Sequence, residues 1–198
     1  MKIIKYQKKN NNNYEIIFEN NEKITLHEDI ILKYKLLYKQ NIDSNFLEKI
    51  INDNNNYKIY DKCIKYISIR LRSINEIKEY LKRNNIEDNL SQEIIEKLKR
   101  NNQLNDEIFT KAFINDKLKF TTMGPYRIEL ELQRHNIDND IIKKYIHEID
   151  EEILKEKINK QITKLIKNKK NKNIIYNKLL NLGYSSEFIL SNLNNYNL

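Results

Sequence analysis

The strongest constraint on the fold is an apolar pattern that recurs three times after residue 56. Three sets of apolar residues share one internal spacing; the second set follows the first by 51 positions, and the third follows the second by 47. The sets are Ile77, Leu81 and Ile86; Ile128, Leu132 and Ile137; and Ile175, Leu179 and Tyr184. Repeats of this length are typical of supersecondary units that bury their apolar faces against their neighbours. The sequence therefore predicts a tandem array.

Residues favoured at helix N-termini stand at matching places in each copy. The predicted N-caps are Asn56, Asn105 and Asp150 for the opening helices, Ser73, Gly124 and Asn171 for the second helices, and Ser91, Asp138 and Ser185 for the third helices. Ser73 and Glu76 also have the spacing of a capping box, and Pro125 suits a first helical position. Each copy is therefore predicted to contain three capped helices.

The first fifty residues follow a different pattern. Short β-prone runs, at residues 3–6, 14–18 and 23–26, are separated by asparagine-rich turns and predict a small meander or hairpin. Helices are expected from about residue 28 to 38 and from 44 to 51, followed by a break at 53–56. The predicted fold is all-α, a tandem array of three three-helix repeats with a small N-terminal β-containing extension. The expected domains are residues 1–56, 57–103, 104–149 and 150–198.

Composition agrees with a helical, solvated array. The chain has only 2 Gly and 1 Pro, 32% charged residues and a mean hydropathy of −0.78. No apolar run is long enough to span a membrane, and no secretory signal is indicated. The single cysteine, Cys63, lies on an apolar stripe and is expected in the core. These features favour a cytoplasmic protein without a disulfide framework.

Two segments carry a family resemblance. The stretch from Cys63 to Ile77, which contains Arg-Leu-Arg-Ser at 70–73, resembles the first-repeat signature of the RecX family of recombinase regulators. The run Leu104–Phe109, followed by Gly124-Pro-Tyr-Arg-Ile128, is similar to the second-repeat signature. The resemblance implies a non-enzymatic, cofactor-free monomer that binds the RecA filament on single-stranded DNA and lowers its ATP hydrolysis and strand exchange, and so modulates recombination and DNA repair.

The net charge of +8 and the pI near 9.2 favour an acidic partner or phosphate. The candidate partner- or DNA-binding residues are basic and are expected to be exposed: Arg70, Arg72, Arg127, Arg134, Lys164, Lys167, Lys169, Lys170 and Lys172. The lysines are expected to cross a loop, where they could add weak direct DNA binding. Helix capping, packing or ordinary solvated surface is the competing interpretation for each residue.

Two other function classes stay open. A DNA-binding regulator that resembles a helix-turn-helix protein would also contain three-helix units with basic helices. Here those helices carry Glu76, Glu79, Glu129 and Glu131 as well, which would repel a phosphate backbone. A hydrolase has less support, because His27, His135 and His147 are scattered and the sequence contains no metal-ligand spacing, phosphate loop or nucleophile elbow.

Overall fold

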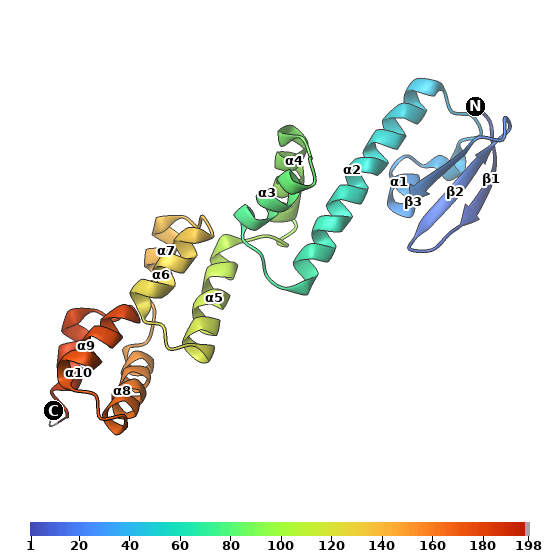
Figure 1. Cartoon of the computed structure of the whole chain (residues 1–198). Coiled ribbons are helices and arrows are strands. Elements are labelled where there is room, and N and C mark those ends of the chain that lie inside the picture. Colours follow the sequence, from blue (N-terminus) through green and yellow to red (C-terminus); the bar gives the residue numbers. More distant parts are fainter. Residues whose placement is uncertain (197–198) are drawn as a thin grey trace. The chain divides into compact units, whose positions relative to one another are not determined.

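An antiparallel sheet of three strands forms the N-terminal part of the chain. In the computed structural model, which describes residues 1–196, the strands β1 (Ile3–Lys8), β2 (Asn13–Phe18) and β3 (Lys23–His27) pair in the order β1-β2-β3 (Figure 1). The helix α1 (Glu28–Lys33) and the 3-10 turn η1 (Leu36–Tyr38) follow. The predicted meander is confirmed, while the helix expected to reach residue 38 ends its α-helical part at Lys33.

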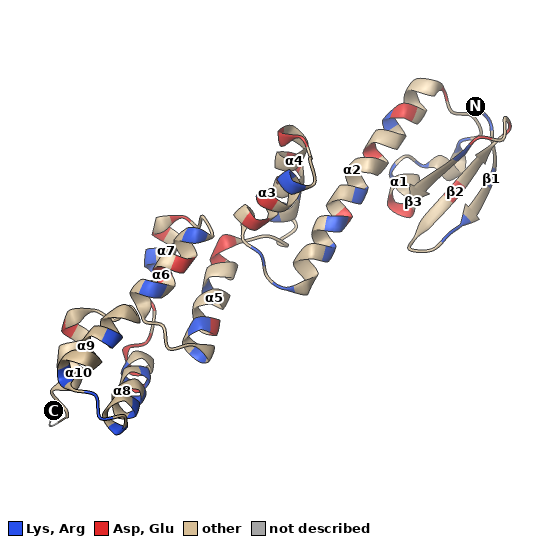
Figure 2. Ribbon diagram, viewed as in Figure 1, with Lys and Arg blue, Asp and Glu red and all other residues tan. Residues whose placement is uncertain are grey.

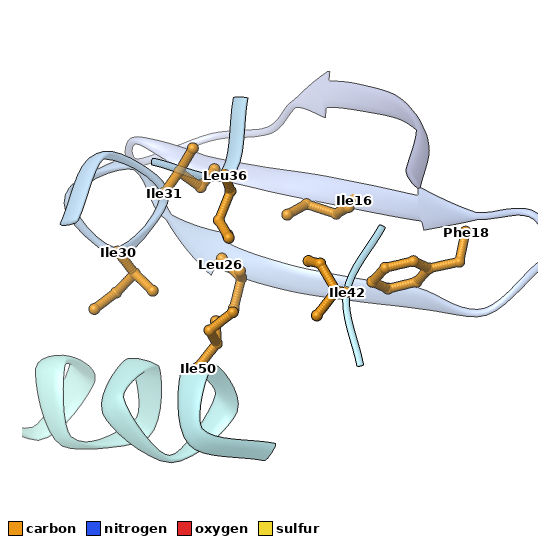
Figure 3. Packing of buried hydrophobic residues seen from close by; sticks show 8 residues of the cluster. All are labelled: Ile16, Phe18, Leu26, Ile30, Ile31, Leu36, Ile42 and Ile50. Atoms are coloured by element: carbon orange, nitrogen blue, oxygen red, sulfur yellow. The ribbon is translucent and has the colours of Figure 1, made fainter. Parts of the chain in front are cut away.

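The core of this part lies between the sheet, α1 and the start of α2. Ile16, Phe18 and Leu26 from the strands meet Ile30 and Ile50, and all five are buried (Figure 3). The second half of β2 alternates between buried and half-buried positions, with Ile16 and Phe18 buried, as expected for a strand with one face packed on a core. The chain divides into two compact units, Met1–Ile69 and Arg70–Leu198, and this core belongs to the first.

A single 26-residue helix, α2 (Ser44–Ile69), runs through the segment where the sequence predicts a break. The predicted break at 53–56 and the predicted cap at Asn56 are therefore wrong. Asn54 is buried, where its side chain accepts a hydrogen bond from the His27 amide (2.9 Å) and donates one to the Thr25 carbonyl (3.1 Å). Its polar groups thus bind the end of β3 instead of interrupting the helix. Cys63, further along α2, is buried as predicted.

The second unit consists of short helices arranged in modules (Figure 1). We call its first pair module 1, the next three helices module 2 and the last three module 3. Their bounds are α3 (Ile74–Arg83) and α4 (Asp88–Arg100); α5 (Asp106–Phe120), α6 (Pro125–Arg134) and α7 (Asn139–His147); and α8 (Glu151–Lys167), α9 (Lys172–Asn181) and α10 (Ser186–Leu193). The repeated Ile and Leu positions on α3, α6 and α9 are fully buried, as the spacing predicts.

Most predicted caps hold. The second helices begin after Ser73, Gly124 and Asn171, and Ser73 forms a capping box with Glu76. The caps at Asn105, Asp138, Asp150 and Ser185 are also confirmed. Besides Asn56, the exception is Ser91, because α4 already begins at Asp88. The Ser91 hydroxyl instead donates to the Ile86 carbonyl (3.4 Å).

The second helices of neighbouring modules meet end to end. At the junction of modules 1 and 2, the Ser73 hydroxyl at the start of α3 donates to the His135 carbonyl at the end of α6 (3.4 Å). At the junction of modules 2 and 3, the Gly124 amide at the start of α6 donates to the Leu182 carbonyl after α9 (2.7 Å), and Tyr126 N–H donates to Gly183 (3.1 Å). At both junctions, N–H or hydroxyl groups at the start of one helix thus donate hydrogen bonds to carbonyls of the next module.

Asparagine occupies most of the left-handed backbone positions. Among residues 1–196, eight non-glycine residues have positive φ, and six of them are Asn. Asn85 and Asn136 follow α3 and α6 at the place that Gly183 occupies after α9. A left-handed residue there lets the last carbonyls of the helix accept hydrogen bonds. Part of the asparagine content therefore closes helices and turns.

Candidate binding surface

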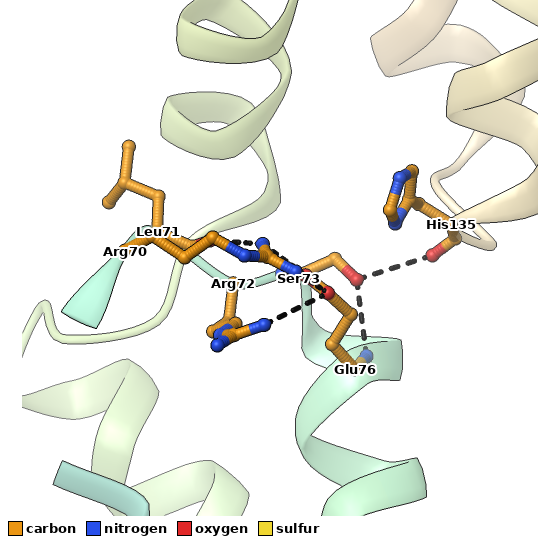
Figure 4. A network of polar contacts seen from close by, with 6 residues as sticks. All are labelled: Arg70, Leu71, Arg72, Ser73, Glu76 and His135. Atoms are coloured by element: carbon orange, nitrogen blue, oxygen red, sulfur yellow. Dashed lines mark hydrogen bonds and ion pairs between the residues drawn. The ribbon is translucent and has the colours of Figure 1, made fainter. Parts of the chain in front are cut away.

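Glu76 lies at the centre of a polar network at the start of α3 (Figure 4). The Arg70 guanidinium donates to both Glu76 carboxylate oxygens and to the Leu71 carbonyl (2.8 Å). Arg72 forms an ion pair with the same carboxylate at 3.5 Å, and the Ser73 amide donates to it at 3.1 Å. The Arg-Leu-Arg-Ser segment is therefore folded around the first turn of α3.

The network lowers the pKa of Glu76. Burial of the carboxyl by itself would raise the pKa, but the hydrogen bonds from Arg70 and the Ser73 amide, together with the positive charge of Arg70, outweigh it. The carboxylate stays charged and anchors both arginines. Of the two, Arg70 keeps a half-exposed side chain, whereas that of Arg72 is only 10% exposed. The expectation that Arg72 is exposed is wrong, because its side chain packs beside Glu76.

The two arginines of α6 differ in what they contact. Arg127 and Arg134 are both exposed, as expected. Arg127 lies at the junction with module 3, where its guanidinium donates to the Asn181 carbonyl (3.4 Å). Arg134 lies in the last turn of α6, where a cation complements the negative end of the helix. Both side chains present charge to solvent from one helix.

The lysine set gathers on module 3 (Figure 2). Lys164 and Lys167 lie in the last turn of α8, Lys169 and Lys170 lie in the connection, and Lys172 begins α9. The set therefore crosses a loop, as expected: it spans two helix ends and the four-residue connection between them, which contains two of its members. All five are exposed, and within residues 1–196 none forms an ion pair.

The structure adds Lys160, one turn before Lys164 on the exposed side of α8, to this set. Sequence reasoning missed it because the search began at a presumed loop and not at a helix face. Spacing of three and four residues along α8 would have found it. Unlike the other five lysines, Lys160 forms an ion pair, with Glu156 at 3.6 Å. A pocket of about 690 Å³ lies on this side and is lined by Glu156, Asn159, Lys160, Thr163, Lys164, Lys167 and Asn168.

Other chemistry has little support in the part of the chain that the structure describes. Residues 1–196 contain no group of three or more His, Cys, Asp or Glu side chains placed to hold a metal ion. None of their helices is long and apolar enough to cross a membrane. The His135 ring packs against Phe109 and Phe113 in the core of module 2, with centroids 5.2 and 5.3 Å away. It therefore contributes to packing.

Two family models match consecutive parts of the chain. The first three-helix domain of RecX matches residues 60–98, and the second three-helix domain of RecX matches residues 105–146. The order of the two domains along the chain is the order of the modules in the structure. The chain belongs to the RecX family. The predicted resemblance is thereby confirmed.

Relatives and solved structures agree with the RecX assignment. "Regulatory protein RecX" of Geobacillus thermodenitrificans is 30% identical over 65% of this chain, and that of Listeria monocytogenes serotype 4a is 31% identical over 74%. The chain spans about half the length of these relatives, 49% and 55%. A crystal structure of regulatory protein RecX has a TM-score of 0.83 at 18% identity over 98% of both chains. RecX from Lactobacillus salivarius has a TM-score of 0.68 at 23% identity, over 72% of this chain and 97% of its own. These two structures confirm the fold.

The matched RecX domains contain the candidate arginines but not the lysine set of module 3. Arg70, Arg72 and Glu76 lie in the first matched domain, and Arg127 and Arg134 lie in the second. The lysine set of module 3 lies beyond both matched ranges. The family comparison thus covers the segments that contain these arginines, whereas the lysine set is known only from the structure of this chain.

Proposed function

We propose that this protein binds the filament that RecA forms on single-stranded DNA and inhibits its ATP hydrolysis and strand exchange. The observation that carries the proposal is the successive match of two RecX three-helix domains to modules joined end to end. An array of this kind presents side chains along consecutive modules, which suits a partner that itself repeats. The protein acts without catalysis of its own, in the cytoplasm and as a monomer.

Arg127 and Arg134 are the proposed contacts to the filament in module 2. Both are exposed on α6, and arginine pairs well with carboxylates on a protein surface. Arg70 joins them as a half-exposed contact. For Arg72 we propose a positioning role, in which its ion pair with Glu76 holds the start of α3. The four expected domains are retained as part of this proposal, with the lysine set as a second binding region.

The test is the single-stranded-DNA-dependent ATPase of the cognate RecA. Substoichiometric protein should slow ATP hydrolysis and strand exchange, and the protein alone should hydrolyse no ATP. The double variant Arg127→Glu and Arg134→Glu should inhibit less, since charge reversal replaces attraction by repulsion. The matched control reverses Lys5 and Lys8, two exposed residues of β1, with the same change in net charge.

Three results would contradict the proposal in different ways. Unchanged RecA rates at a molar excess of the protein would remove the function itself. Equal inhibition by the Arg127/Arg134 variant would remove only the proposed contacts. Sequence-specific binding to duplex DNA without RecA would favour a DNA-binding regulator instead.

A further inference from the structure

The net charge of the protein resides in one stretch of module 3. Residues 157–186 contain eight lysines and no Asp, Glu or Arg. The other 168 residues contain 28 basic and 28 acidic side chains, so they carry no net charge. The charge of +8 is therefore localised on the second half of α8, on α9 and on the connection between them.

Module 3 has a lysine at a position where module 2 has the acidic partner of an ion pair. In module 2, Lys117 on α5 pairs with Glu131 on α6 at 2.5 Å. The 47-residue offset places Lys164 and Lys178 at these two positions in module 3. A carboxylate that neutralises a lysine in module 2 is thus replaced by a second lysine in module 3. Two cations at such positions repel each other unless an anion is present.

Three lysines also lie near the N-terminus of a helix, where positive charge lowers stability. Lys169, Lys170 and Lys172 lie at the N-terminus of α9, which has no acidic residue in its first turn. The N-terminus of a helix is the positive end of its dipole, so cations there are unfavourable. By contrast, α8 has Glu151 and Glu152 in its first turn. Lys164 and Lys167 are favourably placed in the last turn of α8, but the three lysines around the start of α9 cost stability in the free protein and favour an external polyanion.

The type of cation indicates which polyanion. All six arginines of the chain lie between residues 70 and 134, and the stretch 157–186 uses lysine alone. Arginine suits paired recognition of carboxylates, whereas lysine acts as a point charge that can follow phosphates in any order. Lys160 and Lys167 are separated by about 10 Å along the helix axis at the rise of an α-helix. That distance corresponds to about three nucleotides of a strand stacked as in B-form DNA, at about 3.4 Å each.

The sides of this lysine row carry neutral hydrogen-bonding groups, an aromatic ring and one carboxylate, Glu156, which pairs with Lys160 at 3.6 Å and leaves the other lysines of the row without an ion pair in residues 1–196. Asn159 and Thr163 line the pocket beside Lys160 and Lys164. The Tyr196 hydroxyl lies 3.4 Å from the Asn159 side chain and 3.5 Å from the Thr163 hydroxyl. Grooves that combine cations with an aromatic ring are typical of proteins that bind single strands without sequence preference.

We propose that module 3 binds the phosphate backbone of single-stranded nucleic acid through Lys160, Lys164 and Lys167 of α8 and Lys169, Lys170 and Lys172 around the start of α9. This inference rests on the proposed function and assigns different partners to different modules. Modules 1 and 2, with their arginines, contact protein, and module 3 contacts the strand.

The experiment measures binding of the full chain, without RecA, to a fluorescently labelled oligothymidylate of about 30 nucleotides, by anisotropy from 50 to 200 mM salt. Lys164→Gln/Lys167→Gln should weaken binding tenfold or more at the lowest salt. Each lost phosphate contact should also flatten the log–log salt slope by about 0.7. The matched control, Lys82→Gln/Lys143→Gln, removes two exposed lysines from α3 and α7 and should change neither quantity. Far-UV circular dichroism confirms that both variants are folded.

Three outcomes would overturn the inference: no binding to the oligothymidylate at 50 mM salt, equal weakening by both double variants, or tighter binding to polyglutamate than to the oligothymidylate. The second would show that only total charge matters, and the third would assign the lysines to an acidic protein. Because RecA is absent, these failures are distinct from failure of the proposed function, which inhibition of the RecA ATPase would still support.

Discussion

Gly124→Ala tests the backbone-to-backbone junction between modules 2 and 3. A Cβ added at Gly124 would lie 2.6 Å from both the carbonyl carbon and the oxygen of Gly183. Ordinary contacts of a Cβ begin near 3.4 Å, so the start of α6 must move away from the end of α9. The φ of Gly124 is −87°, which any residue adopts, so the effect would come from this contact alone.

The expected loss can be worked from the bonds at the junction. Separation breaks the hydrogen bonds from Gly124 N–H to Leu182 and from Tyr126 N–H to Gly183. These contribute about 1–3 kcal/mol together. Overpacking adds about 1–3 kcal/mol where the backbone cannot give way. We therefore expect Gly124→Ala to lower the free energy of unfolding by about 2–6 kcal/mol.

Urea unfolding measures the global effect, and hydrogen exchange of the Tyr126 amide measures the junction itself. Exchange at Tyr126 should accelerate even if the modules unfold one after another. Thr122→Ala, an exposed residue in the same connection, serves as the control and should change stability by less than about 0.5 kcal/mol. A loss below about 1 kcal/mol with unchanged protection of Tyr126 would refute the argument that close approach of the two backbones holds these modules together.

Two further predictions concern module cores and pH. Leu81→Ala and Leu132→Ala each remove a fully buried side chain at equivalent positions and should each cost about 2–5 kcal/mol in urea unfolding; losses under about 1 kcal/mol at both would show that the repeats are out of register. Glu76→Gln should cost about 1.5–3 kcal/mol at neutral pH, because charge-assisted hydrogen bonds to Arg70 and Ser73 are lost. Since the folded-state pKa of Glu76 is lowered, its contribution should be fully present above the unfolded value near 4.5 and disappear as the pH falls through the folded value. A difference between wild type and Glu76→Gln that persists unchanged down to pH 2 would rule this out.

Local signals in the sequence were sufficient for much of the fold. The spacing of Ile77, Leu81 and their counterparts located the second helices, because a buried helix face requires apolar residues at that period. Caps such as Ser73 and Asp138 located helix starts, because their side chains satisfy nearby amides. The continuous helix α2 was missed, since the role of Asn54 depends on β3, which is 27 residues away in sequence. No local pattern carries that contact.

The candidate site was less predictable. Arg70 and Arg72 belong to one short motif and both pair with Glu76, yet the Arg70 side chain is half-exposed and the Arg72 side chain is largely buried. The packing that separates them is not visible in the motif. The charge imbalance of residues 157–186, by contrast, is present in the sequence and would have been found by counting charges module by module. The structure was needed to assign these lysines to one face of α8 and to the start of α9.

The asparagines at left-handed positions bear on how this sequence can evolve. Asparagine tolerates positive φ better than other residues with a side chain, and five turns in residues 1–196 use it, one of them twice, where glycine would be the usual choice. A substitution from Gly to Asn at such turns adds some backbone strain but also restricts the unfolded chain, so the two effects partly cancel. A change in amino-acid composition that replaces glycine by asparagine can therefore occur at these turns with little loss of stability. The two glycines of the chain, Gly124 and the left-handed Gly183, stand where an added side chain would meet another backbone, so asparagine could not replace them in this way.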